Sequence, residues 1–284
     1  MRRTVTLANG DVVPALGLGT WYLGEDPAYD AEETEALAAG IDAGMTLIDT
    51  AEMYGGGLAE ELVGRVIAGR PREELYLVSK VLPHHAGEVD MERACKASLQ
   101  RMGCDYLDLY LYHWRGNIPL DETVGCLNEL EEEGLIRAWG VSNFDIDDME
   151  ELWTTPGGDA CQVNQVLYHL GSRGIEWSLL PWMRQHDVAL MAYCPLAQAG
   201  SLRSGLFGSP AVHKVAQRHG CDATQVLLAW AIRDGHTIAI PRSGRADHVR
   251  MNAAADAVEL DASDLALLDG AFPPPTHKEW LDIQ

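Results

Sequence analysis

Residues 75–113 read LYLVSKVLPHHAGEVDMERACKASLQRMGCDYLDLYLYH, and they contain one complete strand-helix-strand repeat. Two short apolar runs, residues 75–80 and 107–113, have the composition of strands that are buried on both faces. Between them, residues 89–102 place apolar side chains at helical spacing. A helix of this length carries the chain across a sheet, so the pattern predicts two parallel, neighbouring strands.

The same repeat occurs along the whole chain. Strand-like runs lie at residues 16–20, 46–50, 75–80, 107–113, 137–142, 161–166, 188–193 and 237–241. Helical spacing occurs at residues 31–43, 58–68, 89–102, 121–133, 146–153, 175–186 and 223–234. Eight such units favour a closed (β/α)8 TIM barrel of the α/β class over an open doubly wound sheet. The Asn9-Gly10 turn ahead of them predicts a short N-terminal β-hairpin.

A single domain spanning residues 1–284 accounts for this pattern. The pieces at residues 156–158 and 200–210 are rich in Pro or Gly but short, and we interpret them as loops between units. A doubly wound dinucleotide fold would place GxGxxG between its first strand and helix. The segment Gly17-Leu18-Gly19 lacks the third glycine and lies within a predicted strand, so close backbone packing explains it better.

The composition restricts the classes of function. The chain has 21 Lys plus Arg against 43 Asp plus Glu, a formal net charge of −22. Clustered basic residues recognise phosphate backbones and anionic membranes, so neither nucleic acid nor a membrane is an expected partner. No apolar run approaches the roughly 18 residues of a membrane span, and the amino-terminal residues lack a signal-peptide core, which favours a cytoplasmic protein. The six cysteines form no CxxC pair and are expected to be reduced, packed thiols.

Polar side chains follow three successive predicted strands. Asp49 ends the second run, Tyr54 follows it in the loop, Lys80 ends the third run, and His113 ends the fourth. In a barrel, the reactive face lies where the strands end. An Asp and a Lys buried on adjacent strands can pair and so offset their desolvation. Each residue alone has an ordinary structural explanation, as a helix cap, a surface charge or a packed loop residue, but their shared position favours a site.

These four side chains predict a proton donor. Tyrosine is a poor acid at neutral pH, because its ordinary pKa is about 10. We expect the Lys80 ammonium to lower the pKa of the Tyr54 phenol, and Asp49 to keep that ammonium charged. His113 would then orient a carbonyl oxygen beside the phenol. The chemistry that fits is reduction of a carbonyl by hydride, with the proton delivered by Tyr54.

The sequence resembles the aldo-keto reductase family over nearly its whole length. The motifs that carry the resemblance are LGLGTW at 16–21, IDTAEMYG at 48–55, VSK at 78–80, LYHW at 111–114, GVSNF at 140–144, VNQ at 163–165, AY at 192–193 and IPRS at 240–243. The finer pattern, with HWRG at 113–116, NQVLYH at 164–169 and LPW at 180–182, is similar to bacterial members of methylglyoxal-reductase type.

The resemblance implies an enzyme whose barrel binds NADP(H) without a Rossmann fold. It implies a catalytic tetrad of Asp49, Tyr54, Lys80 and His113. It also implies that the nicotinamide carboxamide is held by Ser142, Asn143 and Gln165, and that Tyr193 stacks on the ring. The loop at residues 195–205 would cover the pyrophosphate, with contacts from Leu196 and Gln198. Trp21 and Trp114 correspond to walls of the substrate pocket, although core packing is the alternative for both.

Coenzyme choice depends on residues 242–252. Arg242, Arg245, His248 and Arg250 form a basic segment in a very acidic chain, and guanidinium groups suit bidentate phosphate binding. Together with Ser243 and Asn252, this segment predicts preference for the 2′-phosphorylated coenzyme. His248 stands where many relatives carry Arg, and Met251 where many carry Glu, and these departures could weaken the preference.

The resemblance also indicates the substrate class. Relatives that reduce carbon-carbon double bonds carry an acid in place of His113, so its retention points to carbonyls. The chain ends soon after Lys278, too early for the long C-terminal loop that encloses steroids in some relatives. We expect an open pocket and a monomer that reduces small aldehydes and ketones, including 2-oxoaldehydes such as methylglyoxal.

Two other functions remain open at this point. A barrel of this kind can hold NADP(H) as a redox-sensing or regulatory subunit with little turnover, and the intact tetrad does not exclude that role. A metal-dependent barrel hydrolase would need several His and carboxylate ligands at strand ends. Beyond the tetrad the sequence offers only the His84-His85 pair in a loop, so we expect no metal.

Overall fold

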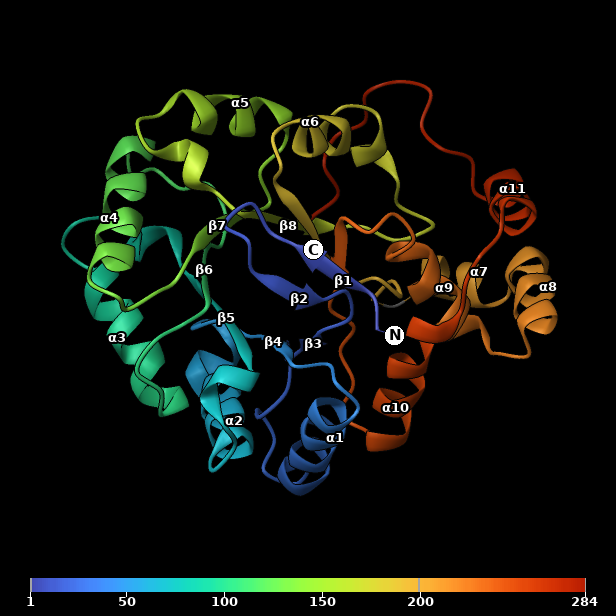
Figure 1. Ribbon diagram of the computed structural model, residues 1–284, viewed down its shortest axis with the longest axis horizontal. Coiled ribbons are helices and arrows are strands. Elements are labelled where there is room, and N and C mark those ends of the chain that lie inside the picture. The colour runs from blue at the N-terminus through green and yellow to red at the C-terminus, as the bar shows by residue number, and fades with distance from the viewer. Residues whose placement is uncertain (1, 199, 284) are drawn as a thin grey trace.

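The computed structural model describes residues 2–198 and 200–283, which form a barrel of parallel strands surrounded by helices (Figure 1). Eight strands follow one another around the sheet in chain order, and every neighbouring pair is parallel. They are β3 (Leu18–Gly19), β4 (Leu47–Asp49), β5 (Tyr76–Val81), β6 (Leu109–Tyr112), β7 (Trp139–Ser142), β8 (Val163–Leu167), β9 (Ala189–Tyr193) and β10 (Thr237–Ala239).

Parallel bridges close the barrel between its first and last strands. Leu16 pairs with Ala239 and Gly19 pairs with Arg242. The amide of Gly17 donates to the carbonyl oxygen of Ala239 at 2.9 Å, and the amide of Ala239 donates to the carbonyl oxygen of Ala15 at 2.8 Å. The predicted (β/α)8 barrel is therefore confirmed, and each strand overlaps its predicted run.

Helices cover the outside of the barrel on all sides (Figure 1). They are α1 (Asp30–Asp42), α2 (Leu58–Ile67), α3 (Met91–Met102), α4 (Leu120–Glu132), α5 (Ile146–Thr154), α6 (Leu179–Gln185), α7 (Gly200–Phe207), α8 (Pro210–His219), α9 (Ala223–Ala231), α10 (Ala246–Ala254) and α11 (Ala262–Ala271). Short 3-10 turns are η1 (Tyr54–Gly57), η2 (Arg72–Glu74), η3 (Pro83–His85), η4 (Gly158–Ala160), η5 (Gly174–Glu176) and η6 (Ala255–Ala257). None of the helices in the described part of the chain is both long and apolar enough to span a membrane.

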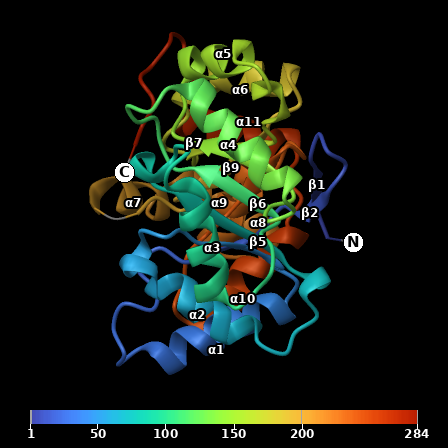
Figure 2. The same ribbon diagram turned by 90° about the vertical axis from the view of Figure 1, so that its left-hand side faces the viewer.

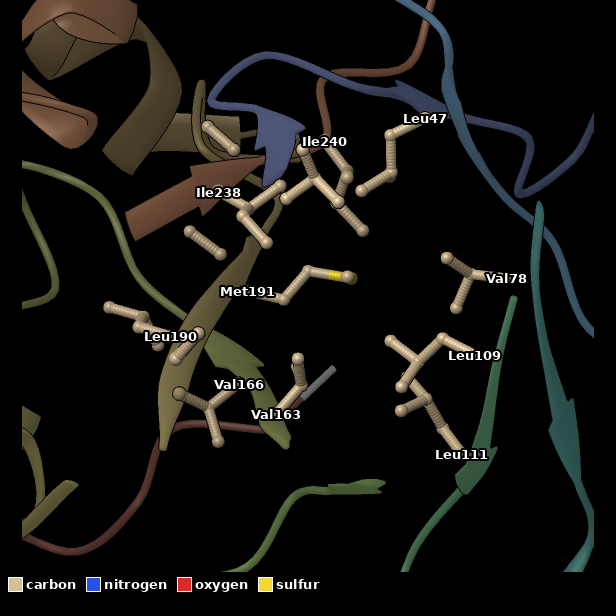
Figure 3. Close-up of a cluster of buried hydrophobic side chains, with 14 of the residues drawn as sticks. Leu47, Val78, Leu109, Leu111, Val163, Val166, Leu190, Met191, Ile238 and Ile240 are labelled. Atoms are coloured by element: carbon tan, nitrogen blue, oxygen red, sulfur yellow. The ribbon is translucent and has the colours of Figure 1, made fainter. Parts of the chain in front are cut away.

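Apolar side chains fill the interior of the ring. Figure 3 shows Met191 reaching from β9 toward the middle, with Val78 and Leu109 on the far side. All three are fully buried. The barrel is thus a packed core and not a pore, which leaves the strand ends as the place for a site.

The predicted N-terminal hairpin is also confirmed. Strands β1 (Thr4–Thr6) and β2 (Val12–Pro14) are antiparallel, and Gly10 in the connecting turn has φ +90°, which glycine adopts without strain. The amide of Asn9 donates to Gln162 Oε1 at 2.8 Å and ties the turn to the barrel. Seen from the side, the hairpin and the carboxyl terminus lie on opposite sides of the molecule (Figure 2).

The interpretation of residues 200–210 as a loop was wrong, because α7 occupies most of this segment and α8 begins at Pro210. Glycines at three positions suggested a loop. Pro210 is favourable at the first position of α8, and Ser209 marks the break between α7 and α8. Helix α10 was not predicted either. Residues 175–186 form η5 and then α6 instead of one continuous helix.

Candidate active site

A cavity of about 810 Å³ lies at the carboxyl ends of the strands. Most of the lining residues end strands or lie in the loops that follow them, as expected for the reactive face of a barrel, and Arg203 on α7 and Ile283 of the C-terminal arm add to the wall. The lining residues include Trp21, Tyr22, Asp49, Met53, Tyr54, His113, Trp114, Arg115, Ser142, Asn143, Gln165, Tyr193, Cys194, Leu196, Ala197, Gln198, Arg203, Arg242 and Ile283.

The four residues of the predicted tetrad lie close together: Asp49, Tyr54 and His113 line this cavity, and Lys80 is buried behind its wall. Lys80 Nζ lies 2.8 Å from Asp49 Oδ2, 2.9 Å from the carbonyl oxygen of Thr50 and 3.1 Å from Tyr54 Oη. The ammonium also lies 4.7 Å from the centroid of the Tyr54 ring. Lys80 is fully buried, so three oxygen atoms replace the water that its charge has lost.

The local sequence explains how Tyr54 reaches this position. Asp49 is the last residue of β4, and Tyr54 opens η1 a few residues later. The next three residues are glycines with φ values of +57°, +64° and +100°. Side chains other than glycine rarely adopt this left-handed conformation. The glycines therefore allow the sharp turn between Tyr54 and the start of α2.

Burial shifts the pKa values of both members of the Asp49–Lys80 ion pair. Loss of water raises the pKa of Asp49 and lowers the pKa of Lys80, because each charged form is disfavoured. The attraction between the two groups and their hydrogen bond oppose both shifts. With the ion pair at 2.8 Å and the Lys80 ammonium bonded to three oxygen atoms, the charged pair is the arrangement that the geometry supports.

The pKa of Tyr54 shifts opposite to the direction expected from the sequence. Burial raises it well above the ordinary value, and the charge of Asp49 and the nearby Cys194 thiol add to the increase. The increase occurs although the Lys80 ammonium is in contact with the phenol oxygen. The phenol therefore holds its proton throughout the neutral range, which suits a group that must donate one.

His113 lies beside the phenol as a neutral ring. Its centroid is 5.9 Å from that of Tyr54 in an edge-on arrangement, and only 7% of the residue is exposed. Burial, followed by the charge of Lys80, lowers the pKa of His113 to about 2. Its Nδ1 has no hydrogen-bond partner among the described residues. The imidazole is thus uncharged at neutral pH and has a free polar atom.

The four residues expected at the nicotinamide also line the cavity, and hydrogen bonds join them to each other and to the tetrad. Gln165 Nε2 donates to Asp49 Oδ1 at 2.7 Å, and Tyr193 Oη donates to Asn143 Oδ1 at 2.9 Å. Ser142 Oγ donates to the carbonyl of Gln165 at 2.8 Å. These bonds fix a row of amide and hydroxyl groups next to the proton donor, and such groups can hold a carboxamide.

The residues expected at the phosphates divide into two groups. Leu196, Gln198 and Arg242 line the cavity, and Arg242 Nη2 donates to the carbonyl of Tyr22 at 3.2 Å. The residues that do not line it are Ser243, which is half-buried, His248, which is exposed, and Asn252, which is buried on α10. Arg245 of the same basic segment forms an exposed ion pair with Asp247 at 2.9 Å.

Aromatic and apolar side chains form the outer wall. Trp21 and Trp114 line the cavity as expected, and Trp21 stacks on Tyr22 with centroids 4.6 Å apart. The sequence analysis missed Tyr22, Met53 and Ile283. Ile283 belongs to the C-terminal arm, which Asp282 attaches to the Ser172 hydroxyl through a hydrogen bond. The arm is short, yet Ile283, which is itself exposed, reaches the wall of the cavity.

The His84-His85 pair, considered above for metal binding, lies in η3. Among residues 2–198 and 200–283, no three His, Cys, Asp or Glu side chains are grouped in a way that could hold an ion. The rings of His84 and His85 are 4.1 Å apart, but His85 Nδ1 bonds to Glu52 at 3.0 Å. That contact joins the loop that carries Tyr54 to the loop after β5.

Comparisons with known proteins agree with this geometry. A family model described as the aldo/keto reductase family matches residues 15–272. Methylglyoxal reductase YeaE of Escherichia coli K12 is 52% identical over 284 residues and covers 100% of each chain. Methylglyoxal reductase DkgB of Escherichia coli O157:H7 is 32% identical and covers 90% of this chain and 93% of its own. A crystal structure of an aldo-keto reductase from Klebsiella pneumoniae in complex with NADPH superposes with a TM-score of 0.96, at 53% identity over 100% of each chain.

Proposed function

The chain belongs to the aldo/keto reductase family, and on that basis we propose that it reduces small aldehydes and ketones to alcohols with NADPH. Its similarity to YeaE supports 2-oxoaldehydes such as methylglyoxal among the substrates. The observation that carries the proposal is the contact of Lys80 Nζ with both Asp49 and Tyr54 beside a cavity.

The residues of the cavity fit the coenzyme. Ser142, Asn143 and Gln165 present amide and hydroxyl groups for the carboxamide, and Tyr193 presents an aromatic ring to stack on it. Arg203 and Arg242 bring positive charge to the same cavity, although the chain carries a net charge of −22. When bound there, NADPH supplies the hydride.

The chain's own side chains supply the remaining steps. Neutral His113 donates an N–H to the carbonyl oxygen of the substrate and positions it near Tyr54 Oη. As negative charge develops on that oxygen, Tyr54 transfers its proton. The Lys80 ammonium, 3.1 Å away, stabilises the phenolate that is left, and Asp49 holds the ammonium in place. This stabilisation grows only as the reaction proceeds, which is what accelerates a chemical step.

The test is coenzyme consumption. Purified protein is mixed with NADPH and each member of a panel of carbonyls, including methylglyoxal, and loss of absorbance of the reduced coenzyme is followed. Saturable consumption supports the proposal. Tight binding of NADPH without consumption across the panel would instead favour the redox-sensing subunit.

Two further properties belong to the proposal. The six cysteines are all free thiols, which supports a reducing compartment, and we place the protein in the cytoplasm. We also propose that it acts as a monomer, because one chain supplies every residue of the site. Sedimentation at working concentration tests the second point, and a dimer would overturn it.

A further inference from the structure

Two buried carboxylates, Glu52 and Glu60, flank the loop that carries Tyr54, and the steps described above give neither of them a role. Neither side chain lines the cavity, so neither is placed to touch substrate or coenzyme. Glu60 is fully buried on α2, and the side chain of Glu52 is only 9% exposed. Burying an ionised group is costly unless it is paired and hydrogen-bonded, so the partners of these carboxylates indicate what they hold in place.

Glu52, two residues before Tyr54, reaches the chain just after Lys80. Its Oε1 accepts a hydrogen bond from the backbone amide of Leu82 at 2.7 Å, and His85 Nδ1 lies 3.0 Å from the same oxygen. The amide of Glu52 also donates to the carbonyl oxygen of Lys80 at 3.5 Å. The segment before the phenol is therefore attached to the end of β5 through both its backbone and its side chain.

Glu60, six residues after Tyr54, reaches the residue just before Lys80. Its Oε1 accepts a hydrogen bond from Ser79 Oγ at 2.6 Å, and its Oε2 accepts one from Arg101 Nε of α3 at 2.5 Å. Successive side chains of a strand point to opposite faces, so Ser79 faces the helices and Lys80 points into the barrel. Glu60 therefore holds the start of α2 against β5 directly behind the ammonium.

The turn between these two attachments depends on such support. Residues 55–57 are all glycines in the left-handed conformation, and glycine loses more backbone freedom on folding than any other residue. The Arg101 side chain that binds Glu60 also packs against this turn, because a Cβ added to Gly57 would lie 2.6 Å from Arg101 Cδ. The glycine turn is thus held before Tyr54 by Glu52 and after it by the Glu60–Arg101 pair.

Resting on the proposed function, we propose that Glu52 and Glu60 are positioning residues that clamp the Tyr54 loop to the residues on either side of Lys80. Tyr54 Oη lies 3.1 Å from Lys80 Nζ, near the upper limit for a hydrogen bond, so a small shift of the loop would break this contact. A displacement of about 1 Å can lower the rate of a positioned reaction about 100-fold. Loosening the clamp should therefore impair proton transfer and leave coenzyme binding intact.

A double-variant cycle tests whether Glu52 acts through the phenol. Glu52→Ala should lower kcat about 10- to 100-fold, with the dissociation constant for NADPH unchanged. In Tyr54→Phe protein the same substitution should lower the residual rate, measured with enzyme in excess over NADPH, less than about twofold, because no phenol is left to position. Equal losses in the two backgrounds would show that Glu52 supports the fold in general and would overturn the proposal.

Milder variants test each half of the clamp without leaving a buried charge unpaired. Glu52→Gln keeps an acceptor for the amide of Leu82 and should recover most of the rate that Glu52→Ala loses. Ser79→Ala removes the bond between β5 and Glu60 but leaves Glu60 paired, and it should lower kcat about 2- to 10-fold, the contribution of one hydrogen bond. Full activity of both Glu52→Ala and Ser79→Ala would refute the clamp.

Asp264→Ala is the matched control, because Asp264 of α11 is equally buried and pairs with Arg218 and His219 of α8, outside the cavity. It should lose stability and keep the kcat of wild type. An equal loss of kcat in Asp264→Ala and Glu52→Ala would trace the defect to stability and overturn the proposal.

Hydrogen exchange measured by mass spectrometry reports on the loop without any turnover. Amides of residues 50–58 should exchange faster in Glu52→Ala and Ser79→Ala than in wild type and Asp264→Ala. Unchanged exchange in this segment would refute the clamp. Wild-type protein that consumes no NADPH with any carbonyl would instead overturn the proposed function, a result distinct from a defect seen only in the variants.

Discussion

The Nζ atom of Lys80, a fully buried residue, lies 3.1 Å from the phenol oxygen of Tyr54. The same ammonium binds Asp49 at 2.8 Å, so a single buried cation joins the carboxylate to the proton donor. Burial keeps the phenol protonated before the reaction, and the cation stabilises the phenolate afterwards. The arrangement therefore separates the two demands on an acid, to hold its proton and then to release it.

Tyr54→Phe should remove the proton donor and little else. We expect kcat for methylglyoxal reduction to fall by about 10²- to 10⁴-fold, the usual contribution of a positioned acid. The dissociation constant for NADPH should change less than about threefold, because a phenyl ring keeps the shape of the side chain. Steady-state kinetics and fluorescence titration measure the two quantities. Retained turnover in the variant would refute the role of Tyr54.

Lys80→Met should lower the stability of the fold as well as the activity. The substitution leaves Asp49 buried without its partner, which costs about 3–5 kcal/mol for a buried pair. Urea unfolding followed by circular dichroism gives the change in free energy. The double variant Asp49→Asn with Lys80→Met removes both charges and should recover most of the stability while remaining inactive. A single variant as stable as wild type would contradict the burial of the pair.

Acid should destabilise the protein through His113. In the unfolded chain this imidazole has an ordinary pKa of 6.5, whereas burial lowers its folded-state pKa to about 2. Between these values the unfolded state binds more protons, so stability is complete above the ordinary pKa and falls as the pH drops. At pH 5 the loss from this residue is about 2 kcal/mol.

Urea titrations of wild type and His113→Asn at pH 7 and pH 5 measure this contribution. The variant should lose less stability than wild type on acidification. His169, whose pKa burial lowers to about 4, contributes in the same direction in both proteins and does not affect the comparison. Equal acid losses would show that His113 is not held neutral by burial.

Arg242→Ala should discriminate between the two coenzymes. If Arg242 binds the 2′-phosphate, the NADPH dissociation constant should rise by about 10- to 100-fold and that of NADH should change little. The ratio of kcat/KM for the two coenzymes should approach one. Arg245→Ala is the control, because Arg245 already pairs with Asp247 at the surface. An equal loss with both coenzymes would place Arg242 at a shared phosphate.

Ile283→Ala should change substrate selection and not chemistry. The side chain belongs to the cavity wall, so its removal should lower kcat/KM for aldehydes with a long apolar chain by about 2- to 10-fold. Methylglyoxal is too small to lose much contact, and NADPH binding should be unchanged. Kinetics with aldehydes of increasing length measure the effect. A uniform loss for all lengths would indicate that the arm supports the fold instead.

The sequence predicted those parts of the fold that depend on the spacing of apolar residues and on the order of strands and helices along the chain. Each strand carries its own apolar run, and successive parallel strands place their carboxyl ends together, so Asp49, Lys80 and His113 could be grouped from the sequence alone. Helix α7 could not be distinguished from a loop, because Gly200, Gly205 and the following Gly208 resemble turn signals. The contribution of burial to the Tyr54 pKa depends on how completely packing excludes water, which no local pattern reveals.

Arg203 and Ile283 were missed for a related reason. Neither belongs to a motif, and each reaches the cavity through contacts with another segment. Arg203 does so through the carbonyls of residues 196 and 197, and the arm that carries Ile283 does so through Ser172 and Asp282. A basic residue in a segment interpreted as a loop is the only signal in the sequence that could have drawn attention to Arg203.

The separation of the hairpin from the C-terminal arm decides how the protein can be attached to a solid support (Figure 2). Tethering through residues before β1 would direct the mouth of the cavity toward the flowing solution. A tether fused after Ile283 would emerge beside that mouth and crowd incoming molecules. Biosensors and immobilised reactors built on this protein should therefore be anchored by the amino-terminal end.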